Sequence, residues 1–502
     1  MSEKLPDNLN GVHIHFVGIK GTGMAALVEI LFHAGAVITG SDVEERFYTD
    51  EILENLNIKP LPFSEKNITS KIQYVIYSSA YKKDKNPDLI EAVKKNIPCL
   101  LYTQALGSYS EKNYSCGICG VHGKTSTTGL TGTILKNLPL PVQVLAGSVI
   151  NSFGNHCTFT SENLNQSNQR IFVAETCEYQ KHFMSFFPKK IILTSVESDH
   201  QDFYPTYTDI LNAFVEYVLK LPQNGTLIFC ADDKGAVEVY QKVKVLRPDI
   251  DFIPYGEKAS GDFNLKFLGI ENEKNNFEVQ FFKKSGFKEF SLSVPGRHEV
   301  LDACAAVCLV CSLLKDFGYK PEDFYNQISS TLLNFSGGKR RSEIVGKIPL
   351  KNNKNVIVID DYAHHPTAIK TTLQGFKEFY KGRKIIVDFM SHTYSRTLSL
   401  LKEFASSFDA ADEIYLHKIY SSARENPSDF EISGKTLYDE VLKTGIKKEN
   451  VHYFEEVLSA LPSVIKSLSL SQDQEEFPDG FLFVTMGAGD NWKLGKALIE
   501  KF

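Results

Sequence analysis

One short segment constrains the fold of this chain more than any other, because it joins a strand-like run to a stretch with helical spacing. Glycines let backbone N–H groups close on phosphate oxygens, a lysine neutralises their charge, and a threonine hydroxyl can ligate magnesium. Position 118 is isoleucine, where the longer nucleotide-loop pattern has glycine, so the match is to the shorter G-x-x-G-K-T form. The segment predicts an α/β domain that binds a nucleotide, with a chance loop as the alternative. Its residues are Gly120, Val121, His122, Gly123, Lys124, Thr125 and Ser126.

Acidic residues and a histidine follow two later strand-like runs. Glu175 comes directly after Ile-Phe-Val-Ala, and a second run, Lys-Ile-Ile-Leu-Thr-Ser-Val, precedes Glu197, Asp199, His200 and Asp202. The carboxyl ends of parallel strands meet at one edge of a sheet, so these side chains can converge on a metal–phosphate complex. Charged residues after strands are also common as solvated loop positions, and only the phosphate loop upstream favours the metal interpretation.

The first part of the chain has the pattern of a doubly wound sheet. An apolar run at 12–17 ends at Gly18, helical spacing follows over 24–34, and a run at 36–38 leads to Gly40, Ser41 and Asp42. This order of strand, glycine turn, helix and strand is typical of a parallel α/β domain. We expect further strands at 74–77 and 99–102, and a first domain over residues 1–108.

The whole chain is too long for one domain, because single cores stop growing near about 250–300 residues and this chain has 502. A central domain over 109–334 is predicted from strand-like runs at 115–118, 171–174, 190–194 and 226–229, with an antiparallel sheet in 256–292 and a helix from near His298. A third domain over 335–502 is predicted from runs at 356–359, 384–389, 413–416 and 481–484. The expected fold class is α/β, with three different domains in series.

Composition excludes several classes of protein. The formal net charge is −6 and Lys and Arg are scattered, which argues against nucleic acid as the main partner. The first ten residues lack a basic segment followed by an apolar run, and no stretch has the ~18 uninterrupted apolar residues of a membrane span. We expect a cytoplasmic protein without a membrane partner.

Two C-x-x-C pairs, Cys116/Cys119 and Cys308/Cys311, fit buried thiols better than a zinc site.

Several motifs in a fixed order resemble the Mur ligase family, and most closely its alanine-adding branch. Asp360-Asp361-Tyr362-Ala363-His364-His365-Pro366 matches the most recognisable C-terminal motif of that family, and 389–397 and 423–425 are similar to segments of the alanine-adding branch. The resemblance runs from about Val12 to Asn491. It implies a Rossmann-like N-terminal domain that binds UDP, a central P-loop ATPase-like domain and a Rossmann-like C-terminal domain.

The resemblance also assigns substrate-binding residues. Those implied to hold the UDP-linked substrate are Gly18, Gly21, Thr22, Gly23, Met24, Ser41, Asp42, Ser78, Ser79 and Ala80 in the first domain, and His392 and Arg396 in the third. Departures from the family pattern are Lys20, Cys177, Tyr179, Ser391 and Thr393.

Nucleotide and metal residues follow from the same resemblance. Those implied to contact ATP are Gly120 to Ser126, His298, Asp302, Arg340 and Asp361, and those implied to hold two magnesium ions are Thr125, Glu175 and His200. Glu299 and Asp302 stand where the family has asparagine. The catalytic set implied is Lys124, Glu175, His200, His364 and Arg396.

The implied reaction joins UDP-N-acetylmuramate to L-alanine in peptidoglycan precursor synthesis. ATP converts the carboxylate into an acyl phosphate, the amine displaces phosphate, and closure of the third domain excludes water. The chain is expected to act as a monomer or weak homodimer. Three alternatives stay open: the related ligase that attaches a recycled tripeptide, a nicotinamide dehydrogenase built on the Gly18 loop, and a nucleotide-binding module without turnover.

Overall fold

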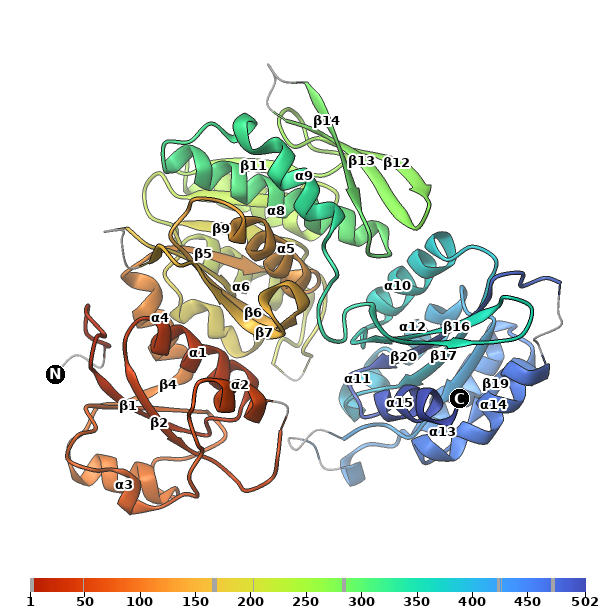
Figure 1. Ribbon diagram of the computed structural model, residues 1–502, viewed down its shortest axis with the longest axis horizontal. Coiled ribbons are helices and arrows are strands. Elements are labelled where there is room, and N and C mark those ends of the chain that lie inside the picture. The colour runs from red at the N-terminus through yellow and green to blue at the C-terminus, as the bar shows by residue number, and fades with distance from the viewer. Residues whose placement is uncertain are drawn as a thin grey trace.

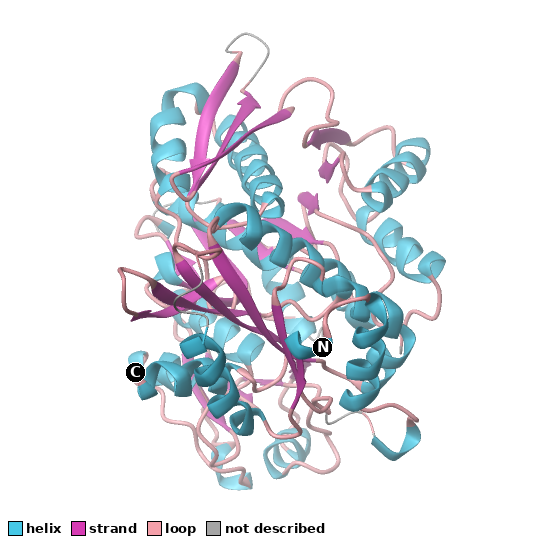
Figure 2. Cartoon of the chain, turned by 90° about the vertical axis from the view of Figure 1, so that its right-hand side faces the viewer, coloured by secondary structure: helices cyan, strands magenta, loops and turns pink. Residues whose placement is uncertain are grey.

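The computed structural model describes residues 4–47, 49–164, 169–201, 203–281, 286–421, 425, 427–470 and 475–502. Asp202, Ala423 and Arg424, noted above, lie outside these residues. Three lobes follow one another along the chain and are coloured red to orange, yellow to green, and cyan to blue in Figure 1. Figure 2 shows helices flanking the strands of each sheet. Among the described helices, none is both long enough and apolar enough to cross a bilayer.

The N-terminal lobe is a parallel sheet with the strand order β2-β1-β3-β4. The turn after β1 contains Gly18 at a φ of +82°, a conformation that glycine adopts without strain. Helix α3 begins where Asn86 accepts hydrogen bonds from the backbone of Asp88 and Leu89, with Pro87 in its first turn. The elements are β1 (His13–Val17), α1 (Thr22–His33), β2 (Val37–Ser41), α2 (Thr49–Asn55), β3 (Tyr74–Tyr77), α3 (Pro87–Lys94), β4 (Cys99–Leu101) and α4 (Tyr102–Glu111). The boundary expected at residue 108 therefore falls inside α4.

The central lobe is built on a larger sheet with the order β11-β10-β9-β5-β8-β6-β7, parallel except for the β6–β7 pair. A separate antiparallel sheet, β12-β13-β14, lies within the expected segment 256–292. The strands are β5 (Tyr114–Cys119), β6 (Val142–Ile150), β7 (His156–Thr160), β8 (Ile171–Glu175), β9 (Lys190–Leu193), β10 (Thr226–Cys230), β11 (Asp251–Tyr255), β12 (Leu265–Glu271), β13 (Lys274–Gln280) and β14 (Phe287–Leu292). The helices are α5 (Lys124–Lys136), α6 (Tyr207–Val218), α7 (Lys234–Leu246), α8 (Arg297–Asp316) and α9 (Tyr325–Leu333).

The C-terminal lobe has the strand order β15-β16-β20-β17-β18-β19, with β15 antiparallel and the other neighbours parallel. Apolar side chains pack on both faces of this sheet and form two separate clusters. The strands are β15 (Glu343–Pro349), β16 (Asn355–Asp361), β17 (Arg383–Met390), β18 (Glu413–Leu416), β19 (Val451–Tyr453) and β20 (Gly480–Gly487). The helices are α10 (Pro366–Phe379), α11 (Tyr394–Ser399), α12 (Leu401–Ala405), α13 (Gly434–Val441), α14 (Leu461–Leu470) and α15 (Trp492–Lys501).

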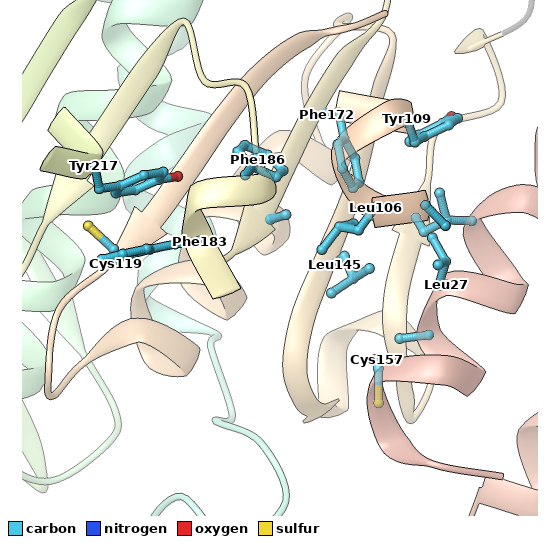
Figure 3. Close-up of a cluster of buried hydrophobic side chains, with 14 of the residues drawn as sticks. Leu27, Leu106, Tyr109, Cys119, Leu145, Cys157, Phe172, Phe183, Phe186 and Tyr217 are labelled. Atoms are coloured by element: carbon cyan, nitrogen blue, oxygen red, sulfur yellow. The ribbon is translucent and has the colours of Figure 1, made fainter. Parts of the chain in front are cut away.

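The first and second lobes share one hydrophobic cluster. Leu27 of α1, Leu145 of β6 and Cys157 of β7 all belong to it (Figure 3). Tyr109 of α4 meets the ring of Phe172 with centroids 5.1 Å apart. Separating these lobes would expose that cluster to water, which opposes their separation. The C-terminal lobe is built around two other clusters, and Ile270 of β12 packs against one of them.

The connection between the second and third lobes is itself fixed to the central sheet. Lys339 N–H donates to Val149 O at 2.9 Å, and Asn151 N–H donates to Gly337 O at 3.2 Å. Gly338 forms a bridge with Ile150, the last residue of β6. The chain therefore leaves the central lobe beside the edge of the sheet where the phosphate loop lies.

Candidate active site

The phosphate loop runs from the end of β5 to the first residue of α5, as the sequence predicted. Gly120 has a φ of +139° and Gly123 a φ of +78°. A Cβ at Gly120 would lie 2.0 Å from Thr194 Oγ1, and one at Gly123 would lie 2.4 Å from Asp302 Oδ1. Both positions thus require glycine for backbone conformation and for space. The loop backbone can approach a bound phosphate because no side chain intervenes.

Lys124 lies across this loop. Its Nζ donates to Gly120 O at 2.5 Å and to Val121 O at 3.2 Å, and it forms an ion pair with Glu178 Oε2 at 3.0 Å. Burial alone would lower the pKa of Lys124, but the carboxylate of Glu178 raises it above its ordinary value. The ammonium group is therefore a permanent positive charge at the loop. Sequence reasoning gave Glu178 no role, although it stands three positions after Glu175.

Thr125 and Glu175 meet at the carboxyl edge of the sheet because β8 neighbours β5. The Thr125 hydroxyl donates to Glu175 Oε2 at 2.8 Å, and Gly147 N–H donates to the same oxygen at 2.8 Å. Hydroxyl and carboxylate oxygens are ligands that Mg²⁺ prefers. His200 lies beside Glu178 instead, with 3.5 Å between its Nε2 and Glu178 Oε1. Its φ of +53° is unusual for a histidine.

Arg396 brings the C-terminal lobe to this edge. Its Nη2 and Nε donate to Asp199 Oδ1 at 2.8 and 3.3 Å, and both side chains are buried. Burial alone would raise the pKa of Asp199, but the Arg396 guanidinium holds it well below its usual range. Burial, and then the charge of Arg396, lower the pKa of His364 and keep its imidazole neutral. His364 Nδ1 lies 2.9 Å from Tyr362 O.

The N-terminus of α8 carries two acids that face α5. Ser126 Oγ donates to Glu299 Oε1 at 2.8 Å, and Thr127 Oγ1 donates to Asp302 Oδ1 at 3.0 Å. Burial raises the pKa of both carboxyl groups, and for Asp302 the charge of Glu299 raises it further. His298, also assigned to the nucleotide, lies in the first turn of the same helix, and its Nδ1 is buried without a hydrogen-bond partner among the described residues.

Two neighbouring arginines at the start of the C-terminal lobe point to different places. Arg340 donates through Nε to Asp360 Oδ2 at 2.9 Å and through Nη2 to Gly487 O at 2.7 Å. Arg341 Nη2 instead reaches Thr125 Oγ1 at 3.3 Å. The sequence resemblance assigned only Arg340 to the nucleotide. The two arginines are adjacent in the sequence, and this pairing could have suggested Arg341 as an alternative. Asp361 accepts hydrogen bonds from the backbone of Ser342 and Ala363.

The residues assigned to the UDP-linked substrate surround the turn after β1. The helix α1 begins at Thr22, next to Gly21, and Gly23 and Met24 follow within it. Asp42 Oδ2 accepts a hydrogen bond from Lys20 N–H at 2.7 Å, and Gly18 N–H donates to Ser41 O at 2.8 Å. A cavity of about 590 Å³ opens beside Lys20 and Asp42. The cation of Lys20 is paired with Asp50 at 3.1 Å. Ser78, Ser79 and Ala80 follow β3, the neighbour of β1, and His392 lies in the C-terminal lobe beside Tyr420.

His122 and His365 meet at the boundary between the central and C-terminal lobes. The ring of His122 contacts Glu197, and His365, which caps the N-terminus of α10, lies near both. The sequence placed Glu197 at the sheet edge near the phosphate loop, and the structure brings it to His122 of that loop. His365 was not expected there, because no spacing rule links it to such distant positions. The four C-x-x-C cysteines are buried and free, and burial raises the pKa of Cys116 to about 12.

Three family models match successive parts of the chain. "Mur ligase family, catalytic domain" matches residues 13–114, "Mur ligase middle domain" matches 118–310, and "Mur ligase, glutamate ligase domain" matches 340–475. Together they cover parts of all three lobes and agree with the resemblance seen in the motifs.

Individual proteins are similar over almost their whole length. A Treponema pallidum (strain Nichols) protein named UDP-N-acetylmuramate--L-alanine ligase is 44% identical over 500 residues, which are 99% of this chain and 98% of that protein. A protein of the same name from Borreliella burgdorferi is 39% identical over 494 residues, with 97% and 98% covered.

Solved structures share the architecture. The UDP-N-acetylmuramate-alanine ligase of Thermotoga maritima matches with a TM-score of 0.72 and 25% identity, covering 97% of this chain and 98% of that one. A murein peptide ligase from Psychrobacter arcticus has the same fold, with a TM-score of 0.62, 21% identity and 98% of each chain covered.

Proposed function

This chain belongs to the Mur ligase family, and we propose that it uses ATP to form an amide bond between the lactyl carboxylate of UDP-N-acetylmuramate and the amino group of L-alanine. The observation that carries this proposal is the convergence of Lys124, Thr125 and Glu175 at one sheet edge, with Arg396 of the third lobe buried at the same edge. The names of the full-length relatives support L-alanine over a recycled tripeptide.

Lys124 supplies the positive charge for phosphoryl transfer. A carboxylate is a poor acyl donor because hydroxide leaves badly, and ATP supplies the phosphoryl group that makes the acyl carbon reactive. Oxygen of the substrate carboxylate bonds to the γ-phosphorus as the bond to ADP breaks, and negative charge spreads over the transferring oxygens. Lys124 then turns from Glu178 towards those oxygens and neutralises them.

Thr125, Glu175 and His200 would hold magnesium. Magnesium would supply further charge neutralisation at the phosphates. The Thr125 hydroxyl and the Glu175 carboxylate are already adjacent and suit this ion. For the second ion we assign His200, with Glu178 beside it.

The third lobe completes the site and excludes water. Arg396 is paired with Asp199, and Arg396, His364 and His392 would face the UDP-linked substrate. In the second step the neutral amine attacks the acyl carbon, phosphate leaves with the bonding electrons, and the amine loses a proton. Excluding water at this stage keeps the acyl phosphate from being hydrolysed.

The nucleotide base would lie near α8, where Asp302 replaces asparagine. A protonated Asp302 can donate one hydrogen bond and accept others, which restores the mixed donor and acceptor character of an amide. His298 and Arg341 flank this region, and Arg340 with Asp361 shapes the loop that holds Arg341. We assign the reaction to the cytoplasm, where ATP and UDP-linked precursors occur, and expect a monomer or weak homodimer.

Replacement of Lys124 tests the proposal. K124A should lower the rate of ADP release with UDP-N-acetylmuramate and L-alanine by at least about 100-fold, as is typical for loss of a charge-stabilising group. K136A is the matched control, because Lys136 ends the same helix and donates to Ser152 O at 2.8 Å, away from the phosphate loop. Parent-level turnover in K124A would refute the proposal, and calorimetry with the UDP-linked substrate checks that the variant is folded.

The choice of amino acid is tested separately. The wild-type protein should release phosphate with L-alanine and much more slowly with L-alanyl-D-glutamyl-diaminopimelate. The reverse order would identify the tripeptide-adding reaction, and release with neither would identify a binding module without turnover.

A further inference from the structure

Three side chains from distant parts of the chain converge where the phosphate loop meets the C-terminal lobe. His122 belongs to the loop, Glu197 follows β9, and His365 precedes α10. One ligand atom of each lies within 4.8 Å of the other two. We propose that His122, Glu197 and His365 bind one transition-metal cation of the zinc class, and that this ion ties the phosphate loop to the C-terminal lobe.

The donor set suits such an ion and not magnesium. Two imidazoles and one carboxylate are ligands that zinc takes in tetrahedral sites, with a water molecule completing the coordination. Magnesium prefers oxygen ligands, and a site with two imidazoles is a poor match for it. None of these three residues is among Thr125, Glu175 and His200, so both kinds of metal can bind at once.

His365 gives independent support for a ligand. Only 6% of this residue is exposed, and its Nε2 is buried without a hydrogen-bond partner among the described residues. A buried ring nitrogen is costly unless it is paired, so nearly all such groups in proteins have a partner. A cation in the cluster would supply one.

The three side chains must rearrange locally to hold an ion. His122 Nε2 already contacts Glu197 Oε1, and His365 Nδ1 lies 3.9 Å from the same oxygen. Ligands of a tetrahedral zinc site, with bonds near 2.1 Å, are about 3.4 Å apart. His365 Nδ1 already accepts a hydrogen bond from Thr367 N–H, so an ion requires the ring to turn its free Nε2 towards the cluster. It also requires the His122–Glu197 contact to lengthen to the ligand spacing.

Neighbouring groups hold two of the ligands in place. Thr367 Oγ1 donates to Glu197 Oε2 at 3.0 Å, and His122 N–H donates to Ser195 Oγ at 2.9 Å. Such outer contacts orient metal ligands in known sites. Because Thr367 and His365 belong to the C-terminal lobe, a bound ion resists separation of that lobe from the phosphate loop.

Cobalt and zinc binding to the full-length protein tests the site without reference to turnover. Co²⁺ gives a visible absorption band when it is tetrahedral, and Zn²⁺ displaces it. We expect one tight equivalent of Co²⁺ in the wild-type protein. H365Q and E197Q should each weaken binding by at least about 100-fold, because losing a ligand costs no less than losing an outer contact.

H200Q is the matched control, since it removes a histidine from the proposed magnesium site and should leave the cobalt band unchanged. Melting temperatures establish that each variant is folded. If H365Q and E197Q bind Co²⁺ as the wild type does, or if only H200Q loses the band, the three residues form an ordinary hydrogen-bonded contact and the proposal is wrong. Cobalt binding and the turnover of K124A are independent measurements. The metal-site proposal can therefore fail while the proposed function stands, and the reverse is also true.

Discussion

Gly123→Ala is the sharpest test of the loop geometry, because a single methyl group meets two separate obstacles there. The backbone of Gly123 has a φ of +78°, which costs an L-residue about 1–2 kcal/mol. The new Cβ would also lie 2.4 Å from Asp302 Oδ1. Asp302 can withdraw only by giving up the hydrogen bond from Thr127, and leaving a buried partner unpaired costs about 1–3 kcal/mol.

Gly154→Ala separates the two costs. Gly154 has a φ of +79°, but the nearest atom to its Cβ would be His156 Cδ2 at 3.8 Å. This control therefore bears the backbone cost alone. We expect the free energy of nucleotide binding to differ by about 2 kcal/mol between the two variants. The strained loop of G123A can no longer direct its N–H groups at phosphate.

Calorimetric titration with a non-hydrolysable ATP analogue measures that difference. G123A should bind the analogue about 30-fold more weakly than the wild type, which corresponds to 2 kcal/mol, whereas G154A should bind it normally. If G123A binds as tightly as G154A, the glycine is not required by the contact with Asp302, and the account of the loop given above is incorrect.

Three further changes have outcomes that follow from single contacts. R396A removes the arginine partner of the buried Asp199 carboxylate, at a cost of up to about 3–5 kcal/mol, and leaves it with its contacts to His200. The C-terminal lobe should then swing away and raise the radius of gyration measured by X-ray scattering; an unchanged profile contradicts this. E175Q should raise the Mg²⁺ concentration for half-maximal turnover at least about tenfold, and an unchanged Mg²⁺ dependence would remove Glu175 from the metal site. Burial alone would raise the pKa of Glu413, but hydrogen bonds from His452, Lys384 and Ser467 lower it to about 2. A folded-state pKa below the ordinary 4.5 stabilises the protein by about 3 kcal/mol above pH 4.5, and this stabilisation is lost as pH falls towards 2. E413Q should therefore lose stability at neutral pH, and its free energy of unfolding should depend less on acid pH. An identical pH dependence in E413Q and the wild type would refute the shift.

Local patterns in the sequence predicted much of the fold. The strands at 74–77 and 413–416 have the expected bounds, because both are short, apolar and framed by polar residues. Strand β6 was not predicted, since Gly147 and Ser148 interrupt its apolar run, and β11 was missed because Pro254 lies within it. The antiparallel edge strand β15 was missed as well, because most of its side chains are not buried.

The candidate site was predictable only where one segment carries the chemistry. Gly120 to Lys124 form a local motif, so sequence alone placed the loop between a strand and a helix. Arg340 and Arg341 could not be told apart, because Arg340 has a φ of +57° that turns the chain and sends the two side chains in different directions. The pairing of Asp199 with Arg396 depends on how two lobes dock, which no local pattern encodes.

The bonds from Lys339 and Gly337 to the end of β6 also set the geometry of opening. They anchor the hinge beside the phosphate loop, so a rotation of the C-terminal lobe has its shortest radius at Arg341 and longer ones towards Arg396. A given angle therefore displaces Arg341 little and carries Arg396 much farther. If the C-terminal lobe rotates about this connection, we expect the nucleotide end of the site to stay nearly assembled while the sugar-acid end opens for substrate exchange.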